Sequence, residues 1–152
     1  YIIVYLLTNL AAFGIVIIAS KTLGSDELEA YNGLSRRNPG LAVLMLIAFL
    51  SLAGIPPMGG FIAKVLVFAA AVQADLVWLA FVGIINAIIG LYYYLIVLKR
   101  VYLYRSEGDE EPMNLPATQA VALAVLIIGI LMMGVIVAPW FDLTTSSALG
   151  LF

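Results

Sequence analysis

Four long apolar runs constrain this chain more than any other feature of its sequence. A helix needs about 20 mostly apolar residues to cross a ~30 Å hydrocarbon layer. Hydrophobic residues make up 64% of the 152 residues, and the mean hydropathy is +1.14, which is typical of membrane proteins. The sequence therefore predicts an all-α membrane protein with four transmembrane helices, at about 1–20, 41–72, 76–98 and 117–138.

The distribution of basic residues predicts how these helices are oriented. Of the seven lysines and arginines, all except Lys64 lie in the two long connections, 21–39 and 99–116. Basic loops stay on the cytoplasmic side of a membrane, so we expect both connections there and the C-terminus on the outer side. Trp78 and Trp140 would then lie in an aromatic belt at the outer interface.

The chain contains no cysteine and no histidine. Without a thiolate or an imidazole it lacks the side chains that usually hold an iron–sulfur cluster, haem or structural zinc. We therefore expect no cofactor and no metal site in this chain, and no nucleic-acid partner. The chain begins at Tyr1 without an initiator methionine or a basic leader, so we expect part of a longer membrane protein rather than a signal peptide.

The second apolar run carries several helix-breaking residues at its centre. Proline removes a backbone donor and glycine tolerates unusual dihedral angles, so we expect two half-helices with a break at Gly54–Gly60. Half-helix ends at membrane depth build ion and substrate sites in transporters. A simple proline kink is the alternative, but two prolines, three glycines and a lysine within eleven residues favour the functional interpretation. The residues of the break are Gly54, Pro56, Pro57, Gly59 and Gly60.

Lys64 follows the break and lies about nine residues, or ~13 Å, from the end of its apolar run. An amine near the bilayer midplane is energetically unfavourable and by default suggests a role in an ion or proton pathway. Its side chain is too short to reach the interface without displacement of the helix. Because burial disfavours the charged form, such an amine can exchange a proton if a carboxylate or water chain controls it. We predict that Lys64 transfers protons.

Polar residues on neighbouring spans are candidates for lining a proton path. An antiparallel hairpin places Asn86 level with Lys64, and Tyr93 or Tyr94 follows at helical spacing. Asn9, with Thr8, lies near the midplane of the first span. Ordinary helix packing and a buried hydrogen bond between helices are the alternatives for these residues. The fourth span is predicted to be a lipid-facing scaffold.

The residues around the break resemble the antiporter-like membrane subunits of respiratory complex I. The segment 51–64 carries the pattern Gly-Ile-Pro-Pro, then Gly-Phe and Lys. The resemblance extends to 9–13, 31–34, 73–74 and the tyrosine run 90–95, and this run narrows it to the subunit N type of bacterial proton-pumping NADH–quinone oxidoreductase.

This resemblance implies that residues 1–152 form the C-terminal part of one antiporter-like domain, the last four of about fourteen helices. In that family the lysine of this broken helix is a proton-channel residue near the outlet, a role that would fall to Lys64. The paired glutamate and central lysine of the family would lie upstream. The resemblance also implies a proton-translocating enzyme complex in the bacterial inner (plasma) membrane. Its NADH, flavin, iron–sulfur clusters and quinone would be bound elsewhere, and its other membrane subunits would be partners.

Two other functions are compatible with the residues. One is a subunit of a multisubunit cation/proton antiporter, which would have a similar helix pattern but would not copurify with redox subunits. The other is a membrane scaffold without transport activity, in which the break only kinks a helix.

Overall fold

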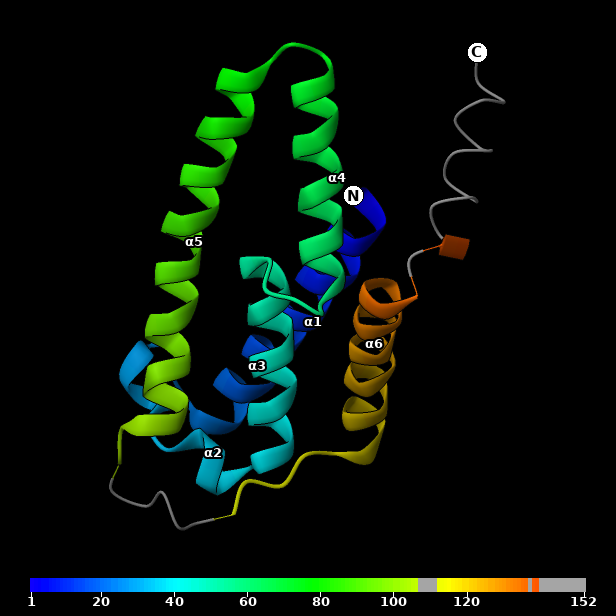
Figure 1. The fold of residues 1–152 in the computed structure, drawn as a ribbon. Coiled ribbons are helices and arrows are strands. Elements are labelled where there is room, and N and C mark those ends of the chain that lie inside the picture. The colour runs from blue at the N-terminus through cyan, green and yellow to red at the C-terminus, as the bar shows by residue number, and fades with distance from the viewer. Residues whose placement is uncertain (107–111, 137, 140–152) are drawn as a thin grey trace.

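The computed structural model describes residues 1–106, 112–136 and 138–139 (Figure 1). All regular secondary structure in these ranges is helical, which confirms the predicted fold class. The elements are α1 Ile2–Leu23, the 3₁₀ helix η1 Leu28–Tyr31, α2 Leu34–Arg37, α3 Pro39–Ala53, α4 Gly59–Gln73, α5 Val77–Leu103 and α6 Ala117–Val135.

Three of these helices, α1, α5 and α6, are long and apolar enough to cross a membrane. The other two apolar helices, α3 and α4, have 15 residues each, and a helix of that length measures only ~22 Å. They follow one another in the predicted second span, so that span is two half-helices. The predicted total of four spans stays a prediction.

The first half-helix, α3, is closed at both ends by its own sequence. Asn38 accepts a hydrogen bond from Leu41 N at 2.9 Å through Oδ1, and Pro39 occupies the first helical position, where its missing N–H leaves no bond unmade. Gly54 ends the helix in the left-handed region, at φ 83°. The second half-helix begins at Gly59, so the break runs from Gly54 to Met58. The predicted break was too long, because Gly59 and Gly60 already belong to α4.

Helix α5 continues beyond its predicted end at residue 98 to Leu103. The prediction was wrong because it placed Lys99 and Arg100 in the connection, whereas cationic side chains stabilise the C-terminal end of a helix. Arg100 forms an ion pair with Glu29 at 3.0 Å, and its guanidinium lies 4.7 Å from the ring centre of Tyr104. The first connection starts later for a similar reason, since α1 includes Lys21 and ends only at Leu23.

The connection between α1 and α3 folds back against the end of the bundle. Tyr31 in η1 is buried, and burial together with the Asp26 carboxylate raises its pKa. Its hydroxyl therefore stays protonated and donates to Val16 O at 3.4 Å. Asn38 Nδ2 donates to Met113 O at 2.8 Å, which ties this connection to the one that precedes α6.

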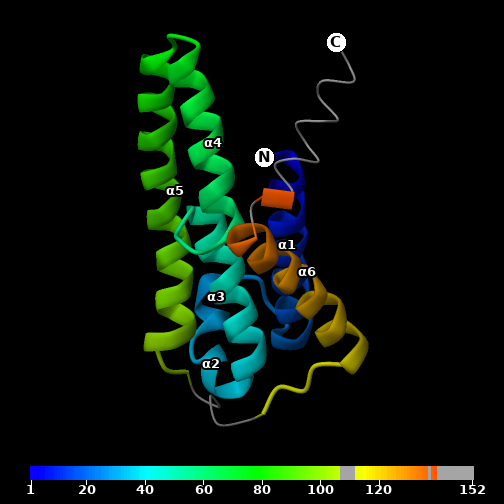
Figure 2. The ribbon, with the colours of Figure 1, turned by 45° about the vertical axis from the view of Figure 1, so that its right-hand side comes forward.

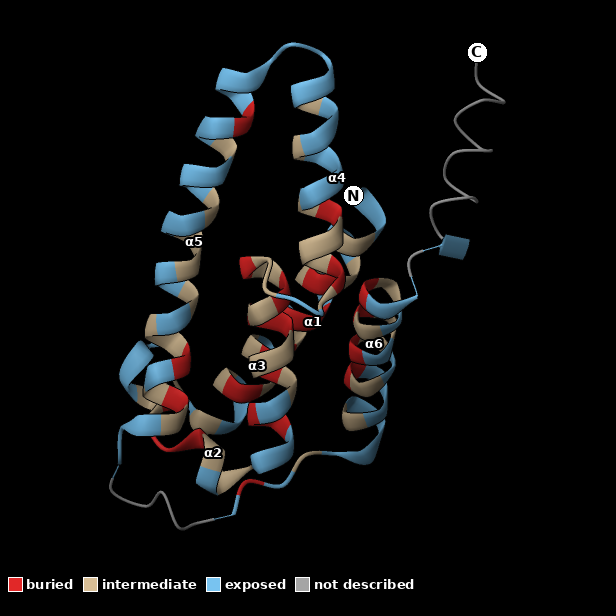
Figure 3. Ribbon diagram, in the orientation of Figure 1, coloured by how far each residue is buried: buried red, intermediate tan, exposed pale blue. Residues whose placement is uncertain are grey.

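The buried core lies between α1, α3, the C-terminal part of α5 and α6 (Figure 3). About half of its members come from α1 and α3, and most of these are alanine, leucine or isoleucine. The α4–α5 hairpin projects beyond this core and is exposed over most of its length (Figures 1 and 3). The core therefore anchors α3, whereas α4 extends away from it.

The two connections that carry the basic residues lie at the same end of the molecule, and the α4–α5 turn lies at the opposite end (Figures 1 and 2). Trp78, 66% exposed, stands beside that turn. This arrangement agrees with the predicted separation of charge between the two sides. The residues that carry the predicted second aromatic anchor, Trp140, and the C-terminus lie outside the described ranges.

Candidate functional site

The site is built where α3 ends and α4 begins. Helix α3 leaves the carbonyl groups of its last turn without partners in the helix, as every helix does. Gly54 N donates hydrogen bonds to the carbonyls of Leu50 and Ser51. The carbonyls of Leu52 and Ala53 are left facing the break. A helix C-terminus carries partial negative charge, so these two oxygens form a place suited to a cation.

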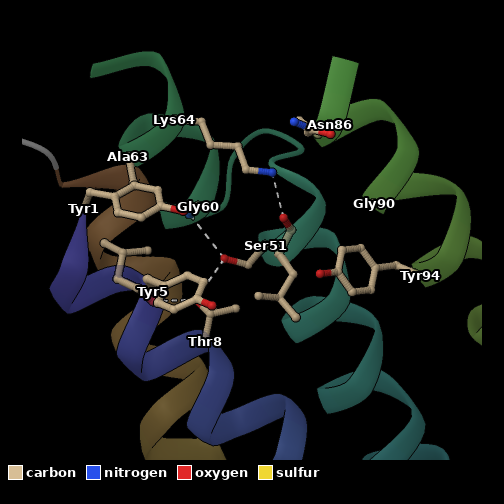
Figure 4. Close-up of a pocket in the computed structure, with 13 residues that line it drawn as sticks. Tyr1, Tyr5, Thr8, Ser51, Gly60, Ala63, Lys64, Asn86, Gly90 and Tyr94 are labelled. Carbon is tan, nitrogen blue, oxygen red and sulfur yellow. Dashed lines mark hydrogen bonds between the residues drawn. The ribbon is translucent and has the colours of Figure 1, made fainter. Parts of the chain in front are cut away.

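Lys64 occupies that place. Its Nζ donates to Leu52 O at 2.8 Å, a bond drawn in Figure 4, and to Ala53 O at 3.0 Å. The side chain runs back along the break over Gly54, where a Cβ atom would approach Lys64 Cδ to 2.8 Å. Gly54 thus serves twice: it adopts the left-handed conformation that ends α3, and it leaves room for the lysine.

A side chain of α3, Ser51, in turn forms a hydrogen bond with the start of α4. Gly60 N donates to Ser51 Oγ at 3.2 Å, and this bond occupies one of the N–H groups that α4 cannot satisfy itself. Ser51 Oγ also lies 3.3 Å from Thr8 Oγ1 of α1. Both hydroxyl residues are only 1% exposed. Helices α3 and α4 approach so closely that a Cβ at Gly60 would overlap Ser51 O.

A cavity of about 180 Å³ lies beside these groups, between α1, α3, α4 and α5 (Figure 4). Five of the predicted residues line it: Thr8, Lys64, Gly60, Asn86 and Tyr94. Asn86 and Tyr94 are contributed by α5, and Asn86 lies at the exposed side of the cavity. The cavity also includes Tyr1, Val4, Tyr5, Ser51, Leu52, Ala63, Ala87 and Gly90.

Two of the residues predicted to line a proton path, Tyr93 and Asn9, do not line this cavity. Tyr93 is 63% exposed and packs edge-on against Tyr92, on the side of α5 that faces away. Asn9 donates to Tyr5 O of its own helix at 2.8 Å. Thr8, its neighbour, is the residue of α1 that faces the break, since one position along a helix rotates a side chain by about 100°.

A second cavity, of about 230 Å³, adjoins Lys64 on its other side. Apart from Lys64 and Gly54, its lining consists of apolar residues from the end of α3, the break, α4 and α5. Lys64 and Ala87 border both cavities. The amine thus stands between a polar and an apolar space, and neither lining includes an aspartate or a glutamate.

Helix α6 covers the backbone of the break. A Cβ at Gly134 would overlap Pro57 O and would come within 2.6 Å of Gly59 N. The face of α6 that carries Leu123, Ile127, Ile130 and Gly134 is buried. The prediction of a lipid-facing scaffold was therefore wrong for this face, because the unwound backbone requires a protein cover.

The sequence prediction assigned no role to Ser51. Its position in the last turn before a break was the available signal, since a buried hydroxyl there can bond to the next half-helix. No group of three or more metal-ligating residues lies in the part of the chain that the structure describes.

Comparison with known proteins identifies the class. Residues 1–90, more than half of the chain, match the family model described as NADH:quinone oxidoreductase/Mrp antiporter, transmembrane. The chain belongs to this family of antiporter-like membrane subunits.

The curated relatives within the family are named as one particular subunit. The chain is 45% identical over 133 residues to NADH-quinone oxidoreductase subunit N 2 of Herpetosiphon aurantiacus, covering 86% of this chain and 24% of the relative. It is 36% identical over 152 residues to subunit N of Moorella thermoacetica, covering 100% of this chain and 32% of the relative. The predicted resemblance to subunit N is confirmed, and the chain spans about a quarter to a third of these relatives' length.

A solved structure agrees with this result. A chain of respiratory complex I from Thermus thermophilus, solved with bound aureothin, superimposes with a TM-score of 0.74 at 30% sequence identity. The match covers 89% of this chain and 32% of that chain.

Proposed function

We propose that this chain is the part of subunit N of NADH–quinone oxidoreductase in which Lys64 transfers protons across the membrane. In this proposal the redox reaction takes place elsewhere in the complex, where NADH, flavin, iron–sulfur clusters and quinone are bound. The other membrane subunits are its partners, and the bacterial inner membrane is its location. The family match and the named relatives support this assignment.

One observation carries the proposal: the amine of Lys64 lies on the free carbonyls of a broken helix and borders a cavity with polar groups. These carbonyls are neutral acceptors, so they hold the ammonium without an opposing full charge. An ammonium held in this way is easier to deprotonate than one paired with a carboxylate. The cavity beside it has room for water, which can carry the proton to and from the amine.

The family description also includes the Mrp antiporters, so the alternative of a cation/proton antiporter remains to be separated by experiment. The lysine at the break would serve the same purpose in either complex. Copurification of the full-length subunit with flavin- and cluster-containing subunits supports the oxidoreductase, and its absence supports the antiporter.

Replacement of Lys64 by methionine in the full-length subunit tests the proposal. Methionine keeps an unbranched side chain but cannot bind a proton. The measurement is the number of protons pumped per NADH oxidised in inverted membrane vesicles, with subunit content checked by immunoblot. We expect Lys64→Met to lower this ratio. Lys21→Met, at an exposed position near the end of α1, is the matched control and should leave it unchanged. An unchanged ratio in Lys64→Met favours the scaffold.

A further inference from the structure

The two half-helices cap each other. Lys64 of α4 satisfies carbonyl groups at the end of α3, and Ser51 of α3 satisfies the N–H group of Gly60 near the start of α4. The bonds cross the break in opposite directions. Only the first of them involves a group that changes charge when a proton is transferred.

The hydrogen bonds of Ser51 have a fixed direction. A hydroxyl has one hydrogen. Thr8 gives its hydrogen to Val4 O at 2.7 Å. The contact of 3.3 Å between Thr8 Oγ1 and Ser51 Oγ must therefore use the hydrogen of Ser51. The chain of donors runs from Gly60 N through Ser51 and Thr8 to Val4 O, and it links α4, α3 and α1.

This chain begins at a backbone amide and ends at a backbone carbonyl, and neither group gains or loses charge near neutral pH. It is therefore a clamp and not a proton wire. The bond from Gly60 N to Ser51 Oγ joins two neutral groups and so does not depend on the charge of Lys64, whereas the attraction between Lys64 and the α3 carbonyls weakens when the positive charge is lost.

We propose that Ser51, oriented by Thr8, is a positioning residue that keeps α4 aligned with α3 while Lys64 gains and loses its proton. The proposal rests on the proposed function of Lys64. Without the clamp, a neutral Lys64 would leave the break held mainly by apolar packing, and the amine would no longer return to the same two carbonyls. Proton transfer would then lose efficiency while the redox reaction continued.

The test uses substitutions that separate the hydroxyl groups from their packing. Thr8→Val keeps the shape and removes the hydroxyl, whereas Thr8→Ser keeps the hydroxyl and removes a methyl group. Ser51→Ala removes the clamp directly. Ser20→Ala is the matched control, because Ser20 Oγ bonds only within its own helix, to Ile17 O. Each variant of the full-length subunit is assayed in inverted vesicles for protons pumped per NADH oxidised and for quinone reduction.

We expect Ser51→Ala and Thr8→Val to lower the proton ratio about two- to fivefold, the effect of one lost hydrogen bond, with quinone reduction retained. Thr8→Ser and Ser20→Ala should pump like the unchanged protein. In a Lys64→Met background, Ser51→Ala should cause no further loss of pumping. A role in packing alone predicts the reverse order for the two Thr8 variants, and that result overturns the proposal.

The failure of this inference is distinguishable from the failure of the proposed function. If Lys64→Met lowers the proton ratio and Thr8→Val and Ser51→Ala do not, Lys64 keeps its role and the clamp is rejected. If Lys64→Met pumps normally, the proposed function itself is rejected and the clamp with it. Should Ser51→Ala fail to accumulate in the membrane, the isosteric pair at Thr8 decides whether the clamp is kept or rejected.

Discussion

The two half-helices α3 and α4 have the same length, 15 residues, but very different surroundings. In α3 seven residues are buried, whereas in α4 only Gly59 and Ala63 are. Both are mostly apolar, so composition does not explain the difference. It follows from the break, which directs α3 into the core and α4 away from it.

This difference in burial gives the two half-helices, α3 and α4, different roles. Helix α3 is fixed by packing and offers its terminal carbonyls as a rigid acceptor. Helix α4 is fixed mainly near its start, by the close packing at Gly59 and Gly60 and by the three side-chain hydrogen bonds across the break. The half that carries Lys64 is thus the less constrained one, which suits the proposed role of Lys64 in proton transfer.

The largest effect is expected from Gly60→Ala, which attacks the contact between the halves. A Cβ there would overlap Ser51 O, a backbone atom that cannot move without shifting α3. We expect a loss of about 3 kcal/mol of stability, measured as a lower thermal unfolding midpoint and less subunit in the membrane. Gly129→Ala is the control, because its new Cβ would meet only a side-chain atom, Leu7 Cδ1, at 3.7 Å.

Gly134→Ala disturbs the packing of α6 against the backbone of the break. The new Cβ would overlap Pro57 O, but α6 lies at the edge of the bundle and can shift as a unit. We therefore expect a smaller loss, about 2 kcal/mol, in the same unfolding measurement. A stability equal to that of Gly129→Ala would mean that α6 does not seal the break.

A matched pair of substitutions tests the asymmetry directly. Ala48 of α3 is fully buried, and Ala69 of α4 is exposed. We expect Ala48→Leu to lower stability by about 1–2 kcal/mol through overpacking and Ala69→Leu to leave it within about 0.5 kcal/mol. Equal losses would contradict the comparison and would indicate that another part of the assembled protein covers α4.

The smallest effect is expected from a substitution of Asn86 in α5, which lines the same cavity as Lys64. Asn86 faces the cavity with Lys64, and Asn86→Leu should lower the proton ratio about twofold by removing one polar anchor. Tyr93→Phe, on the outward side, should change nothing. Pumping that depends on Tyr93 and not on Asn86 would place the path on the other face of α5.

The sequence predicted those features that depend on local chemistry. Gly54, Pro56 and Pro57 together interrupt a helix because they lie within four residues of one another, and counting along the apolar run gave the position of Lys64 relative to the helix end. The end of α5 was missed because Lys99 and Arg100 were counted as connection residues, although cations favour the last turn of a helix.

The role of Ser51 could not be predicted from the sequence alone. It arises only because the start of α4 returns to within hydrogen-bond distance of the last turn of α3, and the direction of that return depends on the whole bundle. The choice between Thr8 and Asn9 likewise depended on the rotation of α1 against α3. No residue pattern within one helix predicts the role of Ser51 or shows which of Thr8 and Asn9 faces the break.

The central claim is that Lys64 must release a proton and not only supply a positive charge to the end of α3. The most direct test is Lys64→Arg in the full-length subunit, since arginine keeps the charge but does not give up its proton in proteins. We predict that its ratio of protons pumped to NADH oxidised falls as far as that of Lys64→Met, with the subunit present in normal amount. A ratio equal to that of the unchanged protein would contradict the account and would reduce Lys64 to a helix cap.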